Sequence, residues 1–194
     1  MPLVWIWLLP AGSALLRAAQ PPGERAVAIY LENIPQLPWD LERTKAITSH
    51  IFLAIHVKVA WIDFHLQRTA PQDGTIVVNF RMGTPIVFQP HALARSYPYE
   101  GTHVEVFYDR VQQLATANRI SVLLAYVLAH EIAHVLEGTV AHSRTGIMKA
   151  GWDVGDFDQM AQGNLAFTDP DIHLIYAGLD ARATRMTADL RKHH

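Results

Sequence analysis

The 194-residue chain contains no cysteine, and only 18% of its residues are charged. Without cysteine it can form neither a disulfide bond nor a lipid-modified cysteine anchor. Its 16 Lys and Arg against 18 Asp and Glu give a formal net charge of −2, and no basic run with interleaved aromatic residues occurs. Nothing therefore indicates a nucleic-acid partner or an anionic membrane surface. Half of the residues are hydrophobic, which suits one compact domain with a substantial core.

The first 19 residues differ from the rest of the chain. Val4–Leu9 is strongly apolar, but the segment is short and Pro10 interrupts it, which disfavours a membrane span. The small residues that follow are typical of a secretory signal peptide, although Met1–Leu9 lacks the usual Lys or Arg. A buried first element is the alternative. We predict that residues 1–19 are a signal peptide followed by a linker at 20–24, and that the protein is secreted or periplasmic, or otherwise cytoplasmic.

Neither proline nor glycine interrupts the apolar segment Ile120–Glu137, which favours one long helix. Within it, residues 130–134 read His-Glu-Ile-Ala-His. Residues four apart lie one turn apart on the same helix face, so His130 and His134 can present two imidazoles to one metal ion. Glu131 lies beside them, close enough to hold or deprotonate a water on that metal. This layout is typical of zinc hydrolases. The alternative is a buried helix whose histidines form core hydrogen bonds.

A catalytic zinc ion usually takes three protein ligands and keeps a fourth position for water, so a third ligand is required. Gly138 is well placed to end the helix in a left-handed conformation and to turn the backbone back. No Glu follows Glu137 in the chain. His142 needs the shortest loop to reach the metal and is the favoured third ligand, with Asp153 as the alternative. The other downstream candidates are His173, Asp156 and Asp158.

Residues His130–Met148 read His-Glu-Ile-Ala-His-Val-Leu-Glu-Gly-Thr-Val-Ala-His-Ser-Arg-Thr-Gly-Ile-Met. This segment resembles the metzincin signature, in which H-E-x-x-H precedes a Gly, a third His and a Met-turn. It looks most like the matrix metalloproteinase branch. The spacing departs from the family pattern, because Gly138 comes one residue later than usual and His142 two residues later. The segment Gly146–Trp152 is also similar to one found in small, uncharacterised bacterial metallopeptidases.

The resemblance implies a zinc-dependent metallopeptidase that hydrolyses peptide or protein substrates. It implies three Zn²⁺ ligands, which are His130, His134 and His142. Glu131 would be the general base towards the metal-bound water, while the metal polarises the scissile carbonyl. Met148 would form an apolar floor beneath the histidines. The alternative is a zincin-like protein that binds metal or peptide without catalysis.

Three further residues are candidates for the cleft. Trp152 could form one of its walls, and His173 and Tyr176 are available to stabilise an oxyanion. Packing in the core explains each of the three at least as well.

The remaining pattern predicts an α+β order of elements. Strands are expected at Arg25–Leu31, Val57–His65, Thr75–Phe80 and His103–Tyr108. Helices are expected from Pro38 to about Val57, after a cap at Asp109, at Ile120–Glu137, at Asp156–Ala161 and from Asp169 onwards. Residues 85–101 are expected to be an irregular loop, and either Thr75–Phe80 or His103–Tyr108 to be the edge strand along the cleft. This order predicts one zincin-like domain over residues 20–194, with a small mixed sheet, an active-site helix and a C-terminal helix.

Overall fold

The computed structural model describes residues 25–35, 38–62, 74–83 and 91–192, so the predicted signal peptide and linker lie outside the described residues. The strands are β1 (Arg25–Glu32), β2 (Val57–Ile62), β3 (Ile76–Arg81), β4 (Ala94–Tyr97) and β5 (His103–Phe107). The helices are α1 (Pro38–Leu53), α2 (Tyr108–Leu114), α3 (Ile120–Glu137), α4 (Val154–Gln162) and α5 (Asp169–Lys192), with a 3-10 turn at Ala117–Arg119.

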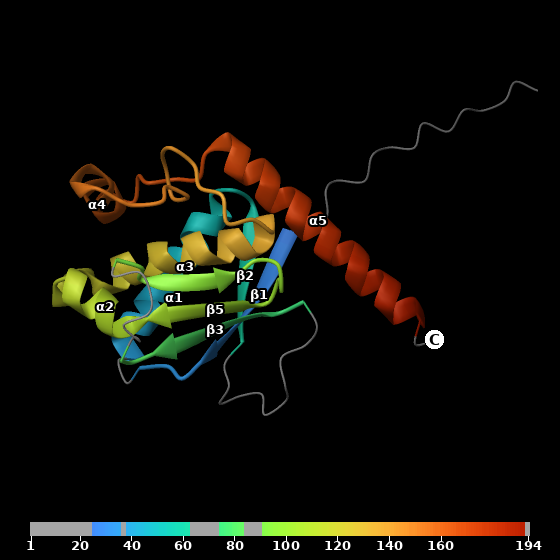
Figure 1. Ribbon diagram of the computed structural model, residues 1–194, viewed down its shortest axis with the longest axis horizontal. Helices are drawn as coiled ribbons and strands as arrows, with labels where there is room; N and C mark the ends of the chain where they lie inside the picture. The colour runs from blue at the N-terminus through green and yellow to red at the C-terminus, as the bar shows by residue number, and fades with distance from the viewer. Residues whose placement is uncertain (1–24, 36–37, 63–73, 84–90, 193–194) are drawn as a thin grey trace, which may run out of the picture.

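The five strands form one mixed sheet in the order β2-β1-β3-β5-β4 (Figure 1). β1 pairs in parallel with both β2 and β3, and β3 pairs in parallel with β5. Only the last pair is antiparallel, with Ala94 of β4 opposite Val106 of β5. The crossover from β1 to β2 runs through α1, as parallel neighbours require. The predicted mixed sheet is therefore confirmed.

The core lies between the sheet and the two helices α1 and α3, which pack against each other. The strands contribute β-branched and aromatic side chains that are almost fully buried, including Ile29, Val78, Val104 and Val106. α3 is buried on nearly every side, because α1, α5 and the sheet surround it. Among the described residues, the helix at Ala117–Glu137 is apolar and long enough to cross a membrane, but 83% of its apolar window is buried inside the protein. It is therefore a core helix.

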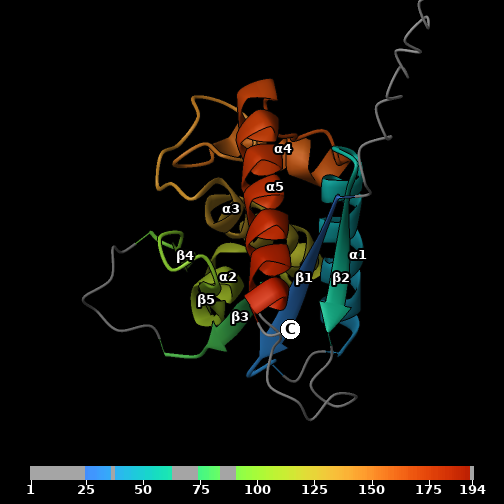
Figure 2. The same cartoon turned by 90° about the vertical axis from the view of Figure 1, so that its right-hand side faces the viewer.

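α5 is the longest of the described helices. It packs across α3 and β1 (Figure 2). A Cβ atom added at Gly178 would lie 1.7 Å from the carbonyl oxygen of Leu136, so the two helices approach each other more closely than any other residue permits. The Tyr176 hydroxyl donates a hydrogen bond of 2.7 Å to the carbonyl of Ile55, just after α1. The first contact holds α5 against the histidine-bearing end of α3, and the second holds it against the end of α1.

Several predicted boundaries were wrong. The segment predicted as an irregular loop at 85–101 contains β4. The edge strands of the described sheet are β2 and β4, whereas β3 and β5 are internal. α1 ends at Leu53 rather than near Val57, where β2 begins. Asp109 lies in the first turn of α2, whose N-cap is Phe107 with no side-chain cap. The predicted end of the second strand is not among these corrections, because β2 is described to Ile62 and residues 63–65 lie outside the described residues.

Candidate metal centre

Two histidines lie one turn apart on α3, and both are buried, with 8% exposure for His130 and 4% for His134. α3 ends because Gly138 adopts a left-handed conformation with φ +67°, and its N–H donates to the His134 carbonyl. A residue without Cβ tolerates this conformation best. The chain then turns back and brings the exposed His142 to the same place. The predicted helix and its end at Gly138 are confirmed, and the three predicted histidines lie together.

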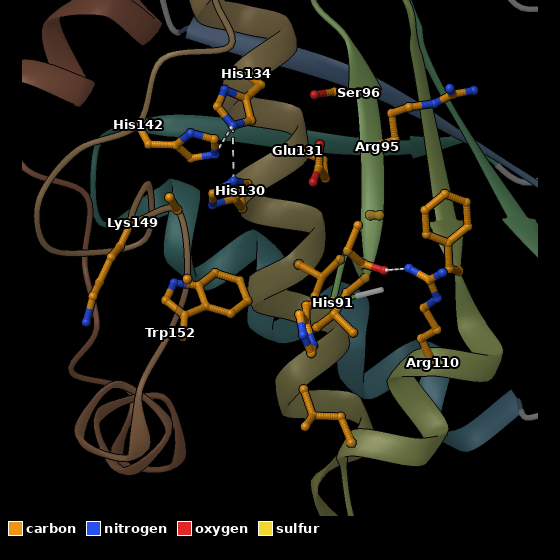
Figure 3. Close-up of a pocket in the computed structure, with 18 of the residues that line it drawn as sticks. His91, Arg95, Ser96, Arg110, His130, Glu131, His134, His142, Lys149 and Trp152 are labelled. Carbon is orange, nitrogen blue, oxygen red and sulfur yellow. Dashed lines mark hydrogen bonds between the residues drawn. The ribbon is translucent and has the colours of Figure 1, made fainter. Parts of the chain in front are cut away.

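The three imidazole rings converge through their Nε2 atoms (Figure 3). His134 Nε2 is 3.0 Å from His130 Nε2 and 3.3 Å from His142 Nε2. Nitrogen atoms bound at about 2.0–2.1 Å to a tetrahedral zinc ion lie roughly 3.3 Å apart. The spacing of the three nitrogens therefore fits a zinc-sized ion with a fourth coordination position left over.

The other ring nitrogens show which atom is available to a metal. His130 Nδ1 is 2.8 Å from the carbonyl oxygen of Ile147, and His134 Nδ1 is 2.9 Å from that of Thr139. A carbonyl oxygen only accepts hydrogen bonds, so each Nδ1 carries the proton and each Nε2 presents a lone pair. Lone pairs this close repel each other unless a cation lies between them. The donor set therefore fits a divalent metal with an affinity for imidazole, such as zinc.

The surroundings also favour the neutral form of the three rings. Burial lowers the pKa of His130. Burial, and next the charges of His130 and His142, lower the pKa of His134 to about 3. For His142, burial and then His130 likewise lower the pKa. Only the neutral imidazole binds a metal, so the site is in its metal-binding form at neutral pH.

The loop that carries His142 is held by residues far along the chain. The hydroxyl of the next residue, Ser143, donates a 2.5 Å hydrogen bond to the carboxylate of Asp171, which is only 3% exposed. The Ile147 N–H donates to the carbonyl of Ala166 at 3.0 Å. Asp171 was not among the predicted site residues, because no local spacing connects a residue of α5 with a histidine loop. It supports the site through Ser143 and does not join the histidine cluster.

Glu131 lies on α3 opposite β4 (Figure 3). Ser96 on β4 lies on the side of α3 that carries Glu131. Burial raises the pKa of Glu131 to about 7, while the Ser96 hydroxyl and then His142 oppose this rise. Sequence reasoning missed Ser96, because it lies in the segment predicted to be an irregular loop.

A cavity of about 930 Å³ lies over the histidines and is called here the histidine cavity. One wall is formed by β4 and the three residues before it, and the opposite wall by the segment Lys149–Trp152. The Trp152 ring packs edge-on against His130 with 5.5 Å between centroids, and its indole N–H donates to the Ile147 carbonyl at 3.3 Å. Trp152 therefore lines the cavity, as the candidate wall residue was expected to do.

The alternative ligands and the oxyanion candidates have other contacts. The Asp153 carboxylate caps α4 by accepting from two backbone N–H groups, and it also lies 2.5 Å from Lys149 Nζ. His173 is exposed on α5 and donates to the carbonyl of Asp169. The Tyr176 hydroxyl donates its hydrogen bond to the Ile55 carbonyl. The two remaining aspartates on α4 are Asp156 and Asp158. None of these candidates lines the histidine cavity.

No protein-family model matches this chain, and no curated protein is detectably similar to it. Solved structures nevertheless share its fold. Archaemetzincin from Methanopyrus kandleri aligns with 82% of this chain and 98% of its own chain, with a TM-score of 0.51 and 14% identity. A zinc-dependent peptidase from Methanocorpusculum labreanum (strain Z) aligns with 77% of this chain and 99% of its own, with a TM-score of 0.51 and 12% identity. The likeness confirms the predicted zincin-like, single-domain fold.

Proposed function

We propose that this protein is a zinc-dependent endopeptidase of the metzincin type, with three histidine ligands and Glu131 as the general base. The ligands are His130, His134 and His142. The observation that carries the proposal is the convergence of three Nε2 atoms beside a carboxylate on the wall of one cavity. The shared fold supports it, since both structures compared above are proteins of metallopeptidase type by name.

Each residue has a separate part in peptide hydrolysis. Zinc, when bound, supplies a Lewis acid that acidifies water and polarises a peptide carbonyl. Glu131 accepts a proton from the attacking water and delivers it to the nitrogen of the leaving amine. Met148 is 1% exposed, and we assign it to the apolar floor of the site.

β4 is the proposed binding strand for the substrate backbone. At one edge of the sheet, β4 has one side without a strand partner among the described residues, and Ala94, Arg95 and Ser96 line the histidine cavity. An extended peptide can add to such an edge through main-chain hydrogen bonds. Because strand pairing reads the peptide backbone rather than a chain terminus, it suits cleavage within a chain, which is why we propose an endopeptidase.

The first test is the metal content of the purified protein and two variants. We expect one tightly bound zinc ion in the wild type, lost or weakened in His142→Ala and retained in Asp153→Ala. The Asp153 variant is the matched control, because it removes the cap of α4 and the contact with Lys149 without touching the histidine cluster. Absence of zinc from the folded wild type, or its loss only from Asp153→Ala, would be incompatible with the proposed ligand set.

The second part of the test separates catalysis from binding. Glu131→Gln should keep zinc but lower the rate of peptide hydrolysis by roughly 10²–10⁴-fold, since it removes general-base catalysis. Undiminished hydrolysis in this variant would refute the role of Glu131. A wild type that holds zinc but cleaves no peptide in a broad library would instead be a zincin-like binding protein.

A further inference from the structure

We infer that a second cavity, adjoining the histidine cavity, binds a carboxylate of the peptide substrate, so that the enzyme prefers acidic peptides. This inference rests on the proposed function, because the substrate of that function is the occupant. The second cavity has a volume of about 750 Å³ and is called here the distal cavity. It is bounded by the end of α2, the 3-10 turn, the start of α3, one face of α4 and Arg43 of α1.

The two cavities are neighbours because they share wall residues. Leu114, at the end of α2, and Phe157, on α4, line both of them. Figure 1 shows α2 and α4 on either side of the N-terminal end of α3, away from the end that bears the histidines. An extended peptide that passes the three histidines can therefore continue past Leu114 and Phe157 into the distal cavity.

The walls of the distal cavity suit an acidic side chain or chain end. Its apolar lining, which suits an aliphatic stem, includes Val122, Leu123, Phe157 and Met160. Two exposed guanidinium groups, from Arg43 and Arg119, line it as well, and neither has a hydrogen-bond or ion-pair partner among the described residues. Guanidinium groups bind carboxylates through paired, charge-assisted hydrogen bonds.

A third donor adjoins the two arginines. The Asn118 side-chain oxygen accepts a 2.7 Å hydrogen bond from the Thr116 hydroxyl, which leaves the Asn118 amide nitrogen as a donor on the cavity wall. Among the described residues, Asp158 is the one acidic residue that lines the distal cavity, against two arginines. The formal charge of the described residues that line this cavity is therefore positive, although the whole chain carries a formal net charge of −2.

The charged residues of the histidine cavity do not offer the same recognition. Lys149 lies between Asp153 and Asp156 at 2.5 and 2.6 Å, and Arg95 pairs with Glu105 at 2.8 Å. Arg110, which also lines this cavity, donates to the Ala92 carbonyl at 2.7 Å and lies over the Phe107 ring. These cations are already engaged by other groups of the protein. The selection of acidic peptides is therefore assigned to Arg43 and Arg119.

The decisive experiment measures peptide binding rather than cleavage, so that it stands whether or not hydrolysis is found. The probes are fluorescein-labelled ten-residue peptides in which a single Glu is moved through a neutral sequence, each matched with a Gln peptide and made with a free or an amidated C-terminus. Binding to zinc-loaded Glu131→Gln protein is followed by fluorescence anisotropy. At one register we expect the carboxylate peptide to bind roughly tenfold more tightly than its neutral match, a difference of about 1.4 kcal/mol, because a carboxylate accepts charge-assisted hydrogen bonds from guanidinium groups and an amide accepts weaker ones.

Variants of the two arginines test whether these side chains bind the carboxylate. In Arg43→Gln and Arg119→Gln, each combined with Glu131→Gln, the ratio of the two affinities should fall towards one. Arg185→Gln is the matched control, because it removes an equally exposed arginine from α5, outside both cavities, and should leave the ratio unchanged. If the preference depends on the position of the Glu, the bound group is the Glu side chain. If amidation of the C-terminus abolishes the preference, the bound group is the C-terminal carboxylate. Equal affinities at every register, or a preference that survives both arginine variants, would overturn the inference.

Hydrolysis by the wild type is scored separately on the same unlabelled peptides. Failure to cleave any of them counts against the proposed function. The ratio of the affinities for the Glu and Gln peptides still tests whether Arg43 and Arg119 bind the carboxylate. Cleavage with equal kcat/KM for the Glu and Gln peptides, together with equal binding, would leave the proposed function standing and refute the distal cavity as a specificity site.

Discussion

Glu137, in the last turn of α3, is a carboxyl group in a poorly hydrated place. Its Oε1 atom is buried and has no hydrogen-bond partner among the described residues. Burial, and next the negative charge of Asp171, raise its pKa to about 8. Asp171 already accepts hydrogen bonds from Ser143 and Thr168, so it offers Glu137 repulsion rather than a partner. The ionised form of Glu137 is therefore unfavourable in the folded protein.

The sign of the resulting pH dependence follows from linkage. An unfolded Glu loses its proton near pH 4.5, whereas folded Glu137 keeps it to about pH 8, so the folded state binds more protons in this window. This group's contribution to stability is thus most favourable below about pH 4.5 and declines as pH rises to about 8. Glu137→Gln should abolish the decline. The Tm of the variant minus that of the wild type should therefore increase from pH 5 to pH 8.5, measured on zinc-free protein.

The matched control for this measurement is Glu100→Gln, because Glu100 has an exposed side chain that lies 4.0 Å from His103 and forms no buried contact. Its Tm difference from the wild type should change much less over the same pH range. A Glu137→Gln difference that is constant with pH, or greatest in acid, would show that this carboxyl does not carry the penalty.

The packing of α5 on α3 depends on one missing side chain. At Gly178 an added Cβ would lie 1.7 Å from the Leu136 carbonyl oxygen and 2.7 Å from its carbon, which are backbone atoms of α3 that cannot rotate away. Alanine would gain roughly 1 kcal/mol of helix propensity over glycine, but overpacking costs about 1–3 kcal/mol and here requires the helices to separate. Gly178→Ala should therefore lower the free energy of unfolding, measured by urea denaturation.

Gly151→Ala provides the comparison for that prediction. Gly151 has no atom within 4 Å of an added Cβ and no positive φ. This substitution should change the free energy of unfolding by less than about 0.5 kcal/mol, as surface substitutions usually do. Equal stability of Gly178→Ala and Gly151→Ala would mean that α3 and α5 are not in the close contact described here.

Elements whose conformation depends on neighbouring residues could be predicted from the sequence. Ile120–Glu137 has no helix breaker and is apolar throughout, and Gly138 supplies the left-handed end, so α3 and the turn towards His142 could be predicted from neighbouring residues. β4 could not, because Ala94–Tyr97 is a four-residue strand without an alternating apolar pattern. Its conformation depends on pairing with β5, and its edge position depends on the order of the whole sheet.

The same distinction explains the site. The three histidines lie within 13 consecutive residues, from His130 to His142, and a spacing argument could bring them together. Their supports come from elsewhere: Ser96 from β4, Asp171 from α5 and the Ala166 carbonyl from the segment before α5. Contacts across such separations leave no periodic signal in a single sequence, so these residues became visible only in the fold.

On the scale of the whole molecule, the proposed metal would link the core helix α3 to the loop that follows it. His130 and His134 belong to the core helix, whereas His142 lies exposed on the returning loop. That loop is anchored to the start of α5 through Ser143 and Asp171. An ion held by all three rings would therefore tie the end of α3 and the start of α5 into one unit. We therefore expect removal of the ion to destabilise regions well beyond the site.

Zinc removal should accordingly lower the stability of the whole domain. A ligand that binds only the folded state and is present at 1,000 times its Kd stabilises that state by about 4 kcal/mol. For a protein of this size each kcal/mol shifts Tm by about 2–4 °C, so chelation should lower Tm by roughly 8–16 °C and added zinc should restore it. In His142→Ala the same treatment should move Tm far less, because one ligand is missing. If chelation left the wild-type Tm unchanged while calorimetry showed cooperative unfolding, the three nitrogens would not hold a metal that contributes to the fold.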